Sequence, residues 1–154
     1  MKQSTTLTFT GDIGFDKYMY KKWDDESLLD PGVVSFLKDS DHVIVNVEGP
    51  LYDKDKDAAN SSDNIKKPEG SAAALVHAMD PAVCDFLEKI NADVWNICNN
   101  HIMDAGPDGI RSTLSYASKC NAKTLGAGAD LKDASSAFLF YFFDTLSYKI
   151  KIAP

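Results

Sequence analysis

The chain has 154 residues, of which 44% are hydrophobic and 25% charged, and its formal net charge is −7. These values predict one ordinary globular domain with a sizeable core. Because an acidic surface repels a phosphate backbone and the lysines are scattered among acids, nucleic acid is not an expected partner.

The N-terminus and the cysteines indicate no export signal and no disulfide framework. Residues 1–10 lack the apolar core of a signal peptide, and no run reaches the ~18 apolar residues that span a bilayer. The three cysteines, Cys84, Cys98 and Cys120, are odd in number and show no C-x-x-C spacing. We interpret them as buried free thiols.

The chain begins with a strand pattern and then a helix pattern. Hydrophobic residues alternate with threonines over residues 6–10, which predicts a strand that delivers Asp12 at its end. An aspartate followed by a proline, Asp30-Pro31, predicts the start of a helix that extends to about residue 39.

A second strand and a long polar loop follow. The β-branched run within residues 41–47 predicts a strand covered on both faces, as in a parallel sheet. Asn46 and Glu48 lie two residues apart at its end, so they share a side. Residues 52–71 are polar and aperiodic, which predicts a long surface loop that is either a flexible excursion, the interpretation we favour, or a functional segment.

The second half repeats the alternation of helix and strand. Apolar residues at helical spacing predict a helix that ends near Asn91, followed by a buried strand over residues 94–98. The remaining expected elements are a helix over 110–120, a short strand over 123–125, one helical turn over 131–135, and a hairpin over 137–143 and 148–153. This order predicts an α/β fold with a mostly parallel first sheet and a C-terminal β-hairpin.

Polar side chains follow three of the predicted strands. They are Asp12; Asn46 with Glu48; and Asn99, Asn100 and His101. If the strands are parallel, these ends meet at one edge of the sheet. Such oxygen and nitrogen donors suit Mn²⁺, Fe, Mg²⁺ or Zn²⁺, and a bound ion could activate water for hydrolysis. The alternative is that these residues only make turns, while His42 and His77 are structural or exposed.

Four motifs carry a resemblance to a known family. In order, FTGDIGF, VNVEGPL, NICNNHIMDAGPDGI and LGAGADLKDA resemble the bacterial CapA family of poly-gamma-glutamate capsule biosynthesis proteins. The resemblance runs from about Leu7 to the end of the chain. It implies a calcineurin-like metallophosphoesterase fold, a four-layer α/β/β/α sandwich, and suggests the cell envelope as location; without it the cytoplasm would be expected.

The resemblance also implies roles for individual residues. Asp12 would match the first metal-binding aspartate, Glu48 the bridging carboxylate, and Asn100 the amide ligand of a second metal. His101 would contact the phosphate and protonate the leaving group. Asn46, Asn99 and Asp104 would support these residues.

Two departures from that pattern weaken the expected catalysis. Gly14 stands where general phosphoesterases carry a histidine, and no histidine follows His101. We therefore expect residues 1–154 to form the N-terminal portion of a single larger domain, an incomplete sandwich that binds divalent metal weakly and hydrolyses phosphoesters poorly.

Three hypotheses for function follow. The first is an ancestral metal-dependent hydrolase acting on a small phosphoester or an anionic polymer. The second is a non-catalytic module that binds an anionic polymer or scaffolds envelope polymer synthesis. The third is an α/β fragment without activity of its own, which would self-associate through the exposed edge of its hairpin.

Overall fold

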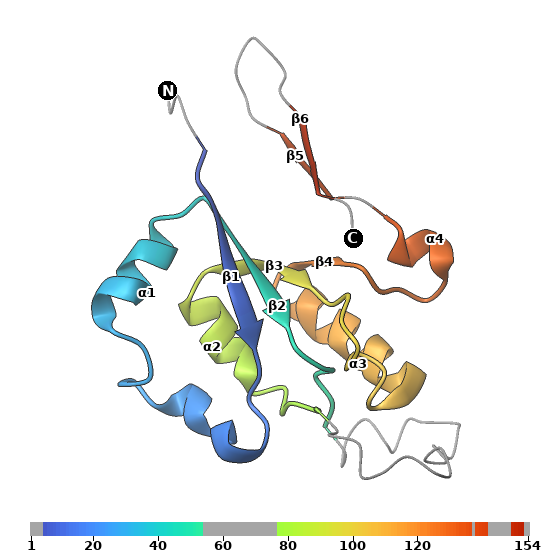
Figure 1. Cartoon of the computed structure of the whole chain (residues 1–154), viewed down its shortest axis with the longest axis horizontal. Helices are drawn as coiled ribbons and strands as arrows, with labels where there is room; N and C mark the ends of the chain where they lie inside the picture. The colour runs from blue at the N-terminus through green and yellow to red at the C-terminus, as the bar shows by residue number, and fades with distance from the viewer. Residues whose placement is uncertain (1–4, 54–76, 137, 142–148, 153–154) are drawn as a thin grey trace.

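A computed structural model describes residues 5–53, 77–136, 138–141 and 149–152 of the chain (Figure 1). The expected loop over residues 52–71 lies outside the described residues from position 54 onward. Of its first residues, Tyr52 is buried, and its backbone N–H donates to the carbonyl of Met79 at 3.0 Å.

The centre of the molecule is a four-stranded parallel sheet, as the sequence predicted. Its strands are β1 (Leu7–Ile13), β2 (His42–Val47), β3 (Ala92–Asn96) and β4 (Lys123–Leu125). They lie side by side in sequence order, and each neighbouring pair is parallel. The arrowheads of β1 and β2 therefore point to the same end of the molecule in Figure 1. All four carboxyl ends meet at one edge.

Among the described residues, three α-helices connect these strands: α1 (Pro31–Lys38), α2 (Val83–Lys89) and α3 (Gly106–Lys119). Two short 3-10 helices, η1 (Lys17–Met19) and η2 (Lys22–Asp24), precede α1. The aspartate–proline start of α1 is confirmed, since Asp30 Oδ1 accepts a hydrogen bond from Gly32 N at 2.7 Å. Asn91 has a φ of 59° just beyond α2, the left-handed conformation expected of a helix stop. Helix α3 begins at Gly106, four residues before the predicted start.

The main core lies between these helices and one face of the sheet. It joins Leu37 of α1 and Phe86 of α2 to strand residues such as Val45 and Trp95. Ile44, Val94 and Leu125 alternate with these residues and form a smaller buried cluster on the opposite face. Strand β2 is thus covered on both sides, as its unbroken β-branched run predicted.

The C-terminal part contains a separate hairpin. A short helix, α4 (Leu131–Ala134), leads to β5 (Phe138–Tyr141), which pairs with β6 (Lys149–Ile152) in antiparallel fashion. These two strands form a sheet of their own. The predicted hairpin is confirmed, with strands shorter than the sequence pattern suggested.

Among the described residues, no helix combines the length and the apolar character that crossing a bilayer requires.

Candidate functional site

A row of three polar side chains crosses the carboxyl end of the sheet. The strand register places Asp12 of β1 opposite Asn46 of β2, and Asn46 opposite Asn96 of β3. Asn46 Nδ2 donates to Asp12 Oδ1 at 2.6 Å, and Asn96 Nδ2 donates to Asn46 Oδ1 at 2.9 Å. These side-chain hydrogen bonds link β1, β2 and β3 in addition to the backbone pairing of the sheet.

A β-bulge in β1 gives Asp12 its place in this row. Phe9 pairs with Ile44 but Asp12 pairs with Asn46, so one extra residue of β1 lies between the two pairs. Side chains alternate between the two faces of a sheet, and a shift of one residue turns the following side chains over. Without the bulge, Asp12 would lie on the face of Val47, which is fully buried in the core. The bulge therefore brings the carboxylate to the same face as the asparagines.

Asn99 connects this row to the loop that follows β3. Its Nδ2 donates to the carbonyl of Val47 at 2.9 Å and to Asn46 Oδ1 at 3.3 Å. Its Oδ1 accepts the backbone N–H of His101 at 3.1 Å. The amide of Asn99 therefore fixes the loop against the end of β2 and sets the backbone of His101.

The imidazole of His101 is held by Asp104. His101 Nδ1 lies 2.9 Å from Asp104 Oδ2, and both side chains are less than one-fifth exposed. A carboxylate only accepts hydrogen bonds, so Nδ1 carries the hydrogen and Nε2 is the remaining ring nitrogen. The same Asp104 oxygen also accepts the backbone N–H of His77 at 2.8 Å.

His77 lies against His101 and Asp104, a contact that our interpretation of it as a structural or exposed residue did not anticipate. The rings of His77 and His101 lie 4.1 Å apart, centroid to centroid. His77 Nδ1 is 2.9 Å from Asp16 Oδ2, and both side chains are 17% exposed. The angles are not those of a hydrogen bond, and within the described part of the chain neither buried atom has a hydrogen-bond partner. We therefore describe the pair as a close electrostatic contact.

Glu48 and Asn100 lie around this network without joining it. The backbone N–H of Glu48 donates to the carbonyl of Ile13 at 3.0 Å, and its side chain is partly buried. A Cβ added to Gly14 would lie 3.7 Å from Glu48 Oε2, so Gly14 borders that carboxylate. Asn100 is exposed, and none of the described contacts links it to Asp12 or Glu48.

These donors suit a divalent cation only in part. Asp12, Glu48 and Asn100 supply oxygen atoms, the type that hard cations prefer. Among the residues that the structure describes, no group of three or more His, Cys, Asp or Glu side chains is placed to hold a metal ion. The described residues therefore do not form a closed metal centre. The ligand roles of these three residues stay predictions.

The amino end of the sheet carries an imidazole–carboxylate pair of its own. His42 Nδ1 lies 2.5 Å from Asp93 Oδ2, and Asp93 Oδ1 accepts the backbone N–H of Val43 at 2.8 Å. This pair joins the first residues of β2 and β3. Because the strands are parallel, it lies at the end of the sheet opposite Asp12 and Asn46.

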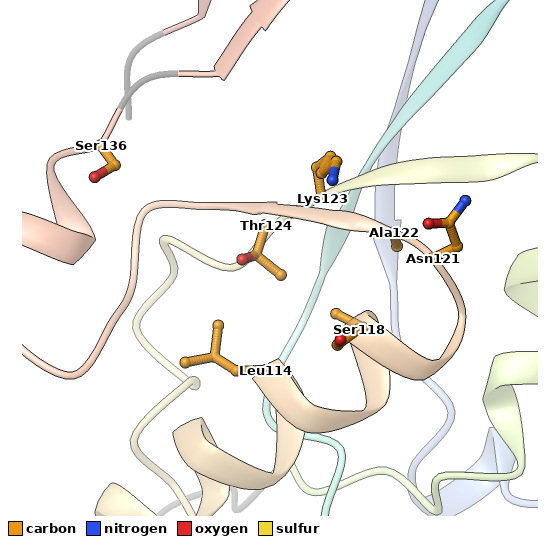
Figure 2. Close-up of a pocket in the computed structure, with 8 residues that line it drawn as sticks. Leu114, Ser118, Asn121, Ala122, Lys123, Thr124 and Ser136 are labelled. Atoms are coloured by element: carbon orange, nitrogen blue, oxygen red, sulfur yellow. The ribbon is translucent and has the colours of Figure 1, made fainter.

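A hollow of about 330 Å³ lies elsewhere, between α3, β4 and Ser136, two residues beyond α4 (Figure 2). Its lining includes Leu114, Ser118, Lys123, Thr124 and Ser136. None of the predicted site residues lines it, so this hollow and the polar row are separate features.

The expectation of three buried thiols holds only in part. All three cysteines are free; Cys84 and Cys120 are partly buried, but Cys98 is exposed. Burial, followed by the neighbouring thiol of Cys120, raises the pKa of Cys84, and burial also raises the pKa of Cys120. The apolar run before Cys98 suggested a longer strand, but β3 ends at Asn96.

Comparison with known proteins gives one family. The profile described as "Bacterial capsule synthesis protein PGA_cap" matches residues 6–150. The fold of that family is metallophosphoesterase-like, a fold type that suggests a divalent metal. The α/β class and the parallel first sheet agree with it.

Two curated relatives are similar to the chain. The PGA biosynthesis protein CapA of Bacillus subtilis (strain 168) is 29% identical over 132 residues, which cover 84% of this chain and 32% of that protein. The capsule biosynthesis protein CapA of Bacillus anthracis is 24% identical over 140 residues, 87% of this chain and 31% of that protein. The chain thus spans about a third of the length of these relatives.

Proposed function

The chain belongs to the bacterial capsule synthesis protein family PGA_cap, and from this premise we propose that the carboxyl edge of its sheet is a weak divalent-cation site with a proton donor beside it. The site would act on an anionic ligand, either a phosphoester or a polymer of the capsule type. The observation that carries the proposal is the chain of contacts from Asp12 through Asn46 and Asn99 to His101 and Asp104.

Asp12, Glu48 and Asn100 would hold the cation. Asp12 uses Oδ1 to accept from Asn46, which keeps Oδ2 for a ligand, and an amide such as Asn100 adds an oxygen donor without adding charge. A bound divalent ion would supply Lewis-acid polarisation of a phosphoryl or carboxyl oxygen. The identity of the ion among Mn²⁺, Fe, Mg²⁺ and Zn²⁺ is not set by oxygen donors alone.

His101 would provide the proton. Asp104 fixes the ring through Nδ1, which directs the chemistry to Nε2. With Nδ1–H paired to Asp104, the ring would donate from Nε2 only in its imidazolium form, which carries a second proton on that atom; an imidazolium is the general acid that histidine supplies near neutral pH. Asn99 contributes by accepting the backbone N–H of His101, which fixes the backbone from which the imidazole side chain extends.

Hydrolysis of a model phosphodiester, bis(p-nitrophenyl) phosphate, with added Mn²⁺ tests the enzymatic form of the proposal. We expect slow, Mn²⁺-dependent turnover that falls by about 100-fold or more in His101→Ala, since a general acid contributes 10²–10⁴-fold. His42→Ala is the matched control, because it removes a carboxylate-paired histidine from the other end of the sheet. Equal rates in wild type and His101→Ala would contradict the role of His101.

The second candidate is a non-catalytic module that binds an anionic polymer. The observation in its favour is Gly14, which leaves the space beside the Glu48 carboxylate without the imidazole of general phosphoesterases. Negligible turnover in both wild type and His101→Ala, together with retention of poly-glutamate by the folded wild type in the presence of Mn²⁺, would support this module over the enzyme.

A further inference from the structure

We propose that His77 is a positioning residue for His101, and that Asp16 holds His77 in place. This inference rests on the proposed function, because it assumes that the orientation of the His101 ring matters. It concerns two residues, His77 and Asp16, that lie outside the motifs from which the site was predicted.

Residue 77 contacts His101 by two routes. Its backbone N–H donates to Asp104 Oδ2 at 2.8 Å, which is the same oxygen that faces His101 Nδ1 at 2.9 Å. Its ring lies 4.1 Å from the His101 ring with an interplanar angle of 56°. One route fixes the carboxylate that orients His101, and the other limits rotation of the imidazole itself.

The backbone around residue 77 is itself held by close packing. Gly49 has a φ of 94°, and a Cβ added there would lie 2.4 Å from the carbonyl oxygen of His77. Leu51 and Met79 form an isolated parallel bridge just beyond it. Segment 77–79 is therefore tied to the chain that leaves β2, directly after Glu48.

Asp16 supplies the remaining constraint. Its Oδ2 lies 2.9 Å from His77 Nδ1, and both atoms are buried. A carboxylate attracts the positive end of the dipole of a neighbouring neutral imidazole, and this attraction is screened little where both atoms are removed from water. Asp16 also follows Phe15, which packs its ring 4.8 Å from that of Phe86 in the core. The backbone that carries the Asp16 carboxylate is therefore fixed by the packing of Phe15 in the core.

The four side chains form two imidazole–carboxylate pairs in contact, Asp16–His77 and His101–Asp104. A pair that only stabilised the fold would not need to face the imidazole of another pair. In this arrangement the His77 ring packs against one side of the His101 ring, and Asp104 accepts at Nδ1. His101 should consequently hold one tautomer, with the hydrogen on Nδ1.

The tautomer of His101 tests this directly. Long-range ¹H–¹⁵N correlation spectra of ¹⁵N-histidine-labelled protein distinguish the two neutral tautomers, at a pH where the imidazoles are neutral. We expect His101 to be mainly the Nδ1–H form in the wild type, to shift toward the Nε2–H form in His77→Ala, and to shift less in His77→Phe, which keeps a ring at this position. His42→Ala serves as the control and should leave His101 unchanged.

Two results would overturn the proposal. One is a wild-type tautomer of His101 in folded His77→Ala, and the other is an equal shift in the His42→Ala control. If His77→Ala does not fold, Asp16→Asn replaces it and should move the His101 signal in the same direction; an unchanged signal would overturn the proposal as well. None of these readouts needs a metal or turnover, so the positioning role and the proposed function can fail separately.

Discussion

The two ends of the parallel sheet carry the same pair of functional groups in different surroundings. At the amino end, His42 lies 2.5 Å from Asp93. At the carboxyl end, His101 lies 2.9 Å from Asp104, and the ring of His77 packs against it. Residue type alone therefore does not distinguish a structural pair from a candidate catalytic one.

The neighbours of each pair make the distinction. Both oxygens of Asp93 are engaged by adjacent residues of β2, so that the pair joins two strands. Asp104 instead begins a chain of contacts that passes through His101 and Asn99 to Asn46 and the exposed Asp12. A network that ends at an exposed carboxylate can meet a ligand, whereas a pair that joins two strands contributes stability.

The largest expected effect is a loss of stability from a change in the backbone at the carboxyl end of the sheet. Gly49→Ala would place a Cβ 2.4 Å from the His77 carbonyl at a φ of 94°, and backbone strain with overpacking should lower the free energy of unfolding by about 3 kcal/mol. Gly11→Ala is the matched control, because no atom lies within 4 Å of its added Cβ. Urea denaturation of both variants measures the difference. Similar loss in both would show that segment 77–79 is not held through Gly49.

The amino end should respond in stability alone. Asp93→Ala removes the acceptor of both His42 and the Val43 N–H, and leaving these partly buried donors unpaired costs about 1–3 kcal/mol. Affinity for Mn²⁺, measured by calorimetry at a temperature where the variant is folded, should equal that of the wild type. A weaker affinity would show that the amino end of the sheet contributes to the cation site.

The side-chain amide of Asn46 should affect both the free energy of unfolding and the affinity for Mn²⁺. Asn46→Ala removes the group that links Asp12, Asn96 and Asn99. We expect a loss of about 1 kcal/mol in the free energy of unfolding, together with a severalfold weaker Mn²⁺ affinity because Asp12 is no longer held. An unchanged affinity would mean that the network supports the fold and not the site.

The smallest effect concerns the thiols. Cys98 is exposed just beyond β3, whereas burial raises the pKa of Cys84, so iodoacetamide followed by mass spectrometry should label Cys98 first. A raised folded pKa stabilises the fold below the ordinary thiol value, about 8.5, and this contribution is lost as the pH rises through the folded value. Stability should therefore fall less steeply above about pH 8.5 in Cys84→Ala than in wild type. Equally fast labelling of Cys84 would contradict the packing.

The sequence predicted what local patterns determine. The β-branched run of β2 and the capping Asp30 are local signals, and both gave the correct elements. Asn46 and Asn99 were recognised because polar residues at the end of an apolar strand are conspicuous, and parallel strands bring such ends together.

Two features of the site depend on tertiary structure and could not be predicted. The bulge that turns Asp12 to the face of Asn46 appears only in the register between β1 and β2. The Asp16–His77 pair forms only when segments far apart in the sequence meet. Asn96 could have been found, since it is a polar residue at the end of the same apolar run, three residues before Asn99.

The most direct test of the proposed site is a calorimetric titration with Mn²⁺ of three proteins: the wild type, the double variant Asp12→Asn/Glu48→Gln, and Asp93→Asn as the amino-end control. We expect the wild type to bind one ion with a dissociation constant on the order of 0.1–1 mM, as for weak oxygen-donor sites. We also expect loss of that binding in the double variant and wild-type binding in the control. A tight two-ion centre in the wild type, or binding that survives in the double variant, would contradict the proposed site.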